Sequence, residues 1–112
     1  MSGRGPRAPT DADPGASDPG RAPVLSRIVV IPNKRGLHAR AAARFVTLAE
    51  RFGAAVDVLR DGQSVSARSI MGLMMLSAGQ GAEIELRAEG WDAREALDAL
   101  VALVESGFHE QD

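Results

Sequence analysis

The chain has 112 residues, no cysteine and a formal net charge of −2, which suits one small domain and excludes a disulfide framework or a thiolate metal site. With no tyrosine, one tryptophan and no overall basic charge, it does not fit the pattern of a nucleic-acid-binding protein. No stretch approaches the roughly 20 apolar residues of a membrane span, so we expect no membrane insertion. The absence of cysteine suits a reducing setting, and we expect a cytoplasmic protein.

The first 23 residues predict a disordered tail, and residues 24 to 112 predict the folded domain. The tail holds five of the six prolines and four glycines, and it has so few apolar residues that burial cannot offset the entropy lost on ordering. A first strand follows over residues 25 to 31 and ends at Pro32. Because residues 28 to 31 are all apolar, the pattern leaves open which of them face the core.

An amphipathic helix is expected to begin at Ala39 and to end before Gly53, since glycine is common just after a helix. Its apolar residues recur at the spacing of a helix that packs on a sheet: Ala42, Phe45, Val46, Ala49 and Phe52. This helix should therefore cover one face of a sheet.

A hairpin comes next, with strands over residues 54–59 and 63–67 around an Asp-Gly pair, which is a strong turn signal. A short helix over residues 70–76 follows, and Ser69 stands at its start as an N-cap residue. Residues 82 to 88 then alternate between polar and apolar, as in a half-buried antiparallel strand.

The last helix is expected to run from Asp92 to about Ser106, and Glu95 completes the pattern of a capping box with Asp92. The complete order of elements is β-α-β-β-α-β-α. It predicts an α+β fold, an open-faced β-sandwich in which three helices cover one face of a four-stranded, mainly antiparallel sheet.

His38 stands where a basic turn meets the first helix. Residues 27 to 51 carry six basic groups against one acid, so this segment is suited to meet an anion. The first-turn amides of the helix lack helical partners, and their dipoles favour negative charge. Gly36 permits a close backbone approach, Leu37 can anchor the turn in the core, and Arg40 is within reach of the same anion.

The sequence allows two interpretations of His38: the imidazole only caps the helix or fills the turn, or it is the reactive group. Because the positive surroundings disfavour a further positive charge, we expect a neutral, nucleophilic ring near pH 7. Such a ring can accept a phosphoryl group, whose oxygens would meet the free amides and Arg40.

No cluster of catalytic acids, bases or Mg²⁺-binding carboxylates accompanies His38 in the sequence. This favours a phosphoryl carrier with a phosphohistidine intermediate, without cofactor or metal, over a free-standing catalyst. The alternative is a regulatory module that binds an anion at the same helix start and forms no covalent bond.

The short helix after Ser69 is too short to bury apolar side chains on all sides. Leu73 and Leu76 are expected in the core, whereas an exposed, methionine-containing patch is typical of an adaptable binding surface. The candidates for this patch are Ile70, Met71, Met74 and Met75. A phosphate on Ser69 would place negative charge beside it.

Two motifs, Gly36-Leu37-His38-Ala39-Arg40-Ala41-Ala42 and Ser69-Ile70-Met71-Gly72-Leu73-Met74, resemble those of the HPr family of histidine-containing phosphocarrier proteins from the bacterial phosphotransferase system. The resemblance covers residues 25 to 108 and departs from many relatives at Ala41, where they have proline. The turn before the first helix and the Met-Met-Leu run are most similar to the nitrogen-related branch.

The resemblance implies that enzyme I phosphorylates His38 at Nδ1 and that the protein passes the group to IIA-type acceptors, with Arg40 assisting, in sugar transport, nitrogen-related regulation or both. It also implies that Ser69 is a regulatory site for an HPr serine kinase. We expect the protein to be a monomer. The resemblance further implies that Ile70, Met71 and Met74 help form the partner-binding surface. We expect the partners to present acidic rims to Arg35, Arg40 and Arg44, which makes Arg44 a further partner-binding candidate.

Overall fold

The computed structural model describes residues 23 to 110, so the predicted tail lies outside the described residues apart from Pro23. Seven elements follow in the predicted β-α-β-β-α-β-α order. They are β1 (Val24–Val30), α2 (Ala39–Ala49), β2 (Ala55–Arg60), β3 (Gln63–Ser66), α3 (Ile70–Met75), β4 (Glu83–Glu89) and α4 (Ala93–Glu105).

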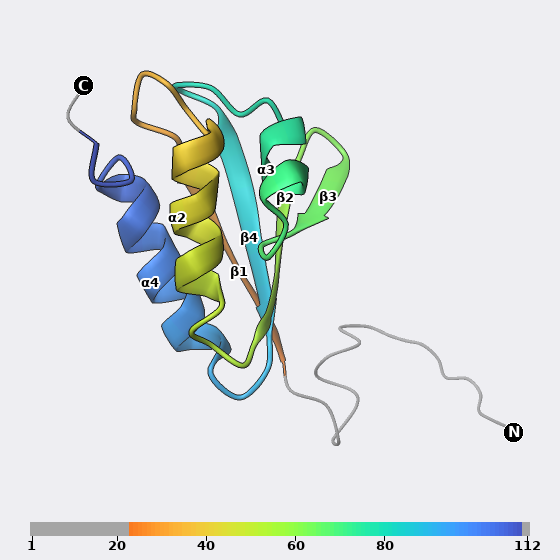
Figure 1. Cartoon of the computed structure of the whole chain (residues 1–112). Helices are drawn as coiled ribbons and strands as arrows, with labels where there is room; N and C mark the ends of the chain where they lie inside the picture. The colour runs from red at the N-terminus through yellow and green to blue at the C-terminus, as the bar shows by residue number, and fades with distance from the viewer. Residues whose placement is uncertain (1–22, 111–112) are drawn as a thin grey trace, which may run out of the picture.

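The four strands form one sheet in the order β1-β4-β2-β3, and every neighbouring pair is antiparallel. All three helices lie on the same face of this sheet (Figure 1), so the predicted open-faced β-sandwich is confirmed. Among residues 23 to 110, no helix is both long and apolar enough to span a bilayer.

The sheet decides which residues of β1 face the core, a question the sequence pattern left open. Val29 pairs with Ile84 of β4 and both are buried, whereas Ile28 is 68% exposed on the open face. Residues directly opposite each other in a sheet point to the same side, so the inward Ile84 fixes the phase of its partner. The core lies between this covered face and the helices, around Phe45, Val58, Leu86, Leu97, Leu100 and Phe108.

Two local expectations need correction. Helix α2 ends at Ala49 rather than near Phe52, because the chain tightens there into a turn in which the amide of Phe52 donates to the carbonyl of Ala49 over 3.2 Å. Asp92 does occupy the N-cap position of α4, but its side chain makes no capping bond. Its two carboxylate oxygens instead accept the amides of Gly53 and Ala54 at 2.9 and 2.8 Å, and so tie two loops together.

Candidate functional site

The turn before α2 is held against the loop that follows α3. Gly36 adopts a left-handed conformation with φ of +64°, and a Cβ at this position would collide with the carbonyl oxygen of Ala78. The amide of Leu37 donates to that same carbonyl over 2.9 Å, and the Leu37 side chain is buried. The anchoring predicted for Leu37 is therefore confirmed, and glycine is required at position 36 for the two loops to meet.

Asn33 is a buried polar residue inside this turn, with 1% of its surface exposed. Its Nδ2 donates to the carbonyl of Gly36 at 3.0 Å and to Oε1 of Glu110 at 2.9 Å. An amide with two donor hydrogens can make both bonds at once. Asn33 thus stabilises the turn from within and links it to Glu110 in the segment after α4.

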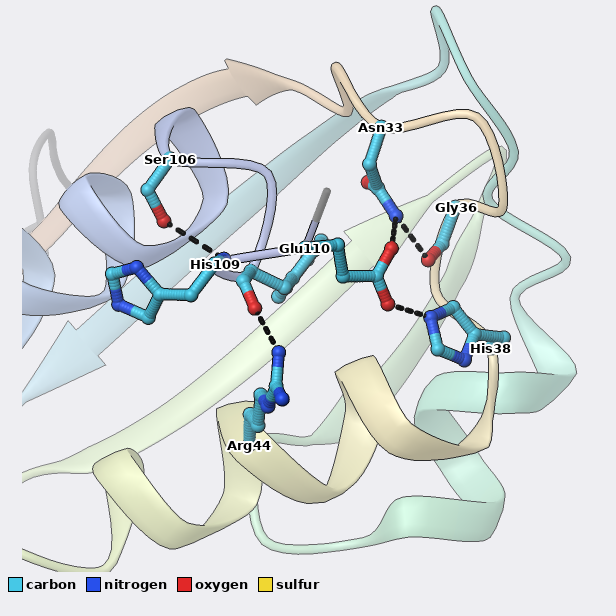
Figure 2. A network of polar contacts seen from close by, with 8 residues as sticks. Asn33, Gly36, His38, Arg44, Ser106, His109 and Glu110 are labelled. Atoms are coloured by element: carbon cyan, nitrogen blue, oxygen red, sulfur yellow. Dashed lines mark hydrogen bonds and ion pairs between the residues drawn. The ribbon is translucent and has the colours of Figure 1, made fainter. Parts of the chain in front are cut away.

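His38 occupies the N-cap position of α2 with an extended backbone, and its carbonyl accepts the amide of Ala42 at 2.8 Å. The imidazole makes no capping bond, so the interpretation that the ring caps the helix is wrong. Its Nε2 instead contacts Oε2 of Glu110, and the other ring nitrogen points away from that carboxylate (Figure 2). The His38 side chain is 15% exposed, which leaves part of the ring open to solvent.

Glu110 is the site residue that the sequence did not indicate. Partial burial raises the pKa of its carboxyl, but hydrogen bonds from His38 and Asn33 and the charges of His38 and Arg35 outweigh this and hold the pKa below its usual range. From the sequence we expected a neutral imidazole because only positive neighbours of His38 were evident. The structure adds a carboxylate, so His38 lies between a helix start and an anionic side chain.

The two predicted arginines lie along one flank of α2 and line a depression of about 430 Å³ together with His109. Arg40 is exposed in the first turn. Arg44 is half-buried, and its guanidinium donates to the carbonyl of Phe108 (Figure 2). Arg44 therefore holds the segment that follows α4 in place.

His38 lines a separate depression of about 290 Å³, which it shares with Arg35, Met74 and Gly79 among others. The two sequence motifs thus meet in space, since Met74 belongs to α3 and His38 precedes α2. Met74 and Arg35 share this depression with the histidine, whereas Arg40 lines the other one.

Helix α3 begins as predicted, because the Oγ of Ser69 accepts the amide of Gly72 at 2.9 Å. Its outer side is apolar and exposed: Met71 by 71%, Met75 by 68%, and Ile70 and Met74 by 40% each. Leu73 and Leu76 are buried. The predicted exposed patch is confirmed, and through Met74 it reaches the depression beside His38.

Fold and site together define a class of protein: a small open-faced sandwich that presents a histidine at an uncapped helix start, next to an exposed apolar patch. Comparison with known proteins agrees with this class. The family model described as "PTS HPr component phosphorylation site" matches residues 25 to 106. The phosphocarrier protein HPr of Cupriavidus necator is 48% identical over 87 residues, which are 78% of this chain and 98% of that protein.

Two further relatives have the same range of similarity. The phosphocarrier protein NPr of Shewanella violacea is 46% identical, over 77% of this chain and 94% of that protein. The crystal structure of HPr from Thermoanaerobacter tengcongensis superposes with a TM-score of 0.75 at 46% identity, over 79% of this chain and 99% of that chain. The chain belongs to the HPr family and acts as a phosphocarrier of the phosphotransferase system. Membership implies enzyme I and IIA-type proteins as its partners.

Proposed function

We propose that His38 is the residue that carries the phosphoryl group, and that Nδ1 is the atom that binds it. The observation that carries this proposal is the orientation of the ring: Nε2 faces Glu110, and the other nitrogen points away from it (Figure 2). Nucleophilic attack requires an unshared electron pair on a nitrogen that the donor can reach. Nδ1 meets that requirement, since the carboxylate covers the opposite side of the ring.

The phosphoryl oxygens would be received by the start of α2 and by Arg40. The amides of the first helical turn have no partners within the helix and attract negative charge. Arg40 belongs to that turn and is exposed, so its guanidinium can swing toward the phosphoryl group. A planar guanidinium matches the geometry of phosphate oxygens.

The partner surface we propose combines Arg44 with the exposed apolar residues of α3, namely Ile70, Met71 and Met74. Enzyme I and the IIA-type acceptors would dock here one after the other, because both must reach the same nitrogen of His38. Apolar contacts would supply affinity, while the basic flank of α2 would orient acidic rims on the partners. We further propose that the protein works in the cytoplasm, as a monomer.

Ser69 is proposed as a regulatory phosphorylation site for an HPr serine kinase. A phosphate there would lie at the start of α3, beside the same apolar residues that we assign to docking. Both HPr and NPr proteins are among the relatives. The protein accordingly serves sugar transport, nitrogen-related regulation or both.

Labelling from phosphoenolpyruvate tests the proposal directly. The full chain, incubated with phosphoenolpyruvate and catalytic enzyme I, is expected to gain one acid-labile, alkali-stable phosphate. His38→Ala should gain none, while the matched variant His109→Ala, which removes the chain's other histidine, should be labelled like the unchanged protein. Equal labelling of His38→Ala would overturn the assignment of His38, and a protein that binds phosphate without labelling would be a non-covalent anion-binding module.

A further inference from the structure

The segment after α4 turns back toward the reactive histidine through an unusual backbone path. Gly107, Phe108 and His109 all have positive φ values, of 69°, 58° and 59°. Residues other than glycine rarely adopt this conformation, and here two of them do so in succession. The result is a tight reversal that brings the next residue, Glu110, over the turn before α2 (Figure 2).

Several contacts hold this reversal in place. Phe108 is fully buried in the core, and its amide donates to the carbonyl of Leu103 over 3.0 Å. Its carbonyl accepts the guanidinium of Arg44. The amide of Glu110 donates to the carbonyl of Gly107 over 3.1 Å. The segment from Gly107 to Glu110 is therefore fixed to the domain.

Each carboxylate oxygen of Glu110 has its own partner in the site. Oε2 contacts Nε2 of His38, and Oε1 accepts Nδ2 of Asn33 at 2.9 Å. Asn33 is itself held by the carbonyl of Gly36. The Glu110 side chain is 11% exposed, so the carboxylate is a largely enclosed member of the site and not a mobile surface charge.

We propose that Glu110 is a positioning residue for phosphoryl transfer, which fixes the proton of His38 on Nε2 and directs Nδ1 toward the start of α2. The proposal rests on the phosphocarrier role of His38 given above. A carboxylate can only accept a hydrogen bond, so its contact with Nε2 selects the tautomer that has the proton there. The same use of a carboxylate to orient an imidazole occurs in serine protease triads.

The chemistry of the transfer explains what this contact contributes. The Nδ1 electron pair forms the N–P bond while the bond from phosphorus to the donor atom of enzyme I breaks, and that electron pair stays on the donor atom. Nε2 keeps its proton throughout, so the ring carries a positive charge while the phosphoryl group is attached. An adjacent carboxylate stabilises this charge. When the acceptor takes the group, the N–P electron pair returns to the ring.

Glu110→Gln is the test, because it keeps the size of the side chain and removes its charge. Glutamine has an NH2 donor in place of one of the two carboxylate oxygens, so only one of the two positions that face His38 and Asn33 still holds an acceptor. The matched control is Glu105→Gln, which removes the same charge from an exposed residue at the end of α4. Two quantities are measured on the full chain: the initial rate of phosphorylation by enzyme I, and the nitrogen chemical shifts of the His38 imidazole.

For Glu110→Gln we expect the rate to fall roughly tenfold, as for the loss of one hydrogen bond to a charged group, and the imidazole shifts to move toward a mixture of tautomers. Glu105→Gln should change neither quantity. An unchanged or faster rate in Glu110→Gln would overturn the proposal, and a faster rate would make the carboxylate an inhibitory cover of the ring. Unchanged imidazole shifts would overturn it as well. Failure of the phosphocarrier role itself would look different, because the unchanged protein would then take up no phosphate on His38.

Discussion

Helices α2 and α3 both start from a residue with an extended backbone, but their starts differ in what the side chain of that residue does. At α3, the hydroxyl of Ser69 accepts the amide of Gly72. At α2, the imidazole of His38 makes no bond to the helix and turns to Glu110 instead. One helix start is closed by its own N-cap residue, and the other is left open.

The difference shows that the start of one helix can stabilise the fold, while the start of another can bind a reacting group. An N-cap bond satisfies one of the first-turn amides and stabilises the helix by about 1 kcal/mol. Without that bond, the amides of α2 remain available to an incoming anion. The stability not gained at α2 is offset elsewhere, since Ala41, Ala42 and Phe45 of this helix are fully buried.

Replacing Arg40 by alanine should have the largest effect, which is slower phosphoryl transfer at the uncapped start of α2. A hydrogen bond to a charged group contributes roughly 1.5–3 kcal/mol, so we expect Arg40→Ala to slow phosphoryl transfer on the order of 10- to 100-fold. The free energy of unfolding should change by less than about 0.5 kcal/mol, because the Arg40 side chain is exposed. Stopped-flow or quenched-flow transfer rates and urea denaturation measure the two effects.

Arg51→Ala is the control for that experiment, since it removes the same charge from an exposed position just beyond the other end of α2. It should leave the transfer rate nearly unchanged. If both variants slowed transfer equally, the effect would come from the total positive charge around α2 and not from a contact of Arg40 with the phosphoryl group. If Arg40→Ala lost stability in proportion to activity, its role would be structural.

Adding negative charge at the N-cap of α3 should weaken the binding of enzyme I without unfolding the helix. Aspartate and asparagine are both good N-cap residues, so Ser69→Asp and Ser69→Asn should keep α3 intact. Only the aspartate puts negative charge beside Met71 and Met74. We expect Ser69→Asp to bind enzyme I about tenfold more weakly than Ser69→Asn by calorimetry. Equal affinities would mean that the docking surface lies elsewhere.

The smallest effect is expected from removing the cap itself. Ser69→Ala loses the bond to the Gly72 amide and should lower the free energy of unfolding by about 1 kcal/mol, whereas Ser69→Asn should stay close to the unchanged protein. Urea denaturation of the three proteins makes the comparison. A Ser69→Ala protein of undiminished stability would show that α3 does not depend on its cap, and the contrast between the two helix starts would lose its energetic basis.

Most of the fold could be predicted from the sequence because its signals are local. The spacing of Ala42, Phe45 and Val46 is the spacing of a buried helix face, and an Asp-Gly pair marks the hairpin. The Ser69 cap and the exposed methionines of α3 were predictable for the same reason, since a cap acts within one turn and a two-turn helix cannot be buried on every side. The predicted capping box of α4 is wrong because the Asp92 carboxylate accepts the amides of Gly53 and Ala54, which are distant in sequence, instead of an amide of its own helix.

By itself, the sequence determined the order of elements, the buried faces of the helices and the histidine at the start of α2, because each depends on residues only a few positions apart. The tertiary structure alone decided the inward face of β1, the meeting of His38 with Met74, and the contact of His38 with Glu110. His38 and Glu110 lie 72 positions apart. No periodicity links them, and they meet because α4 packs on the sheet and the chain after it reverses through Phe108 and His109.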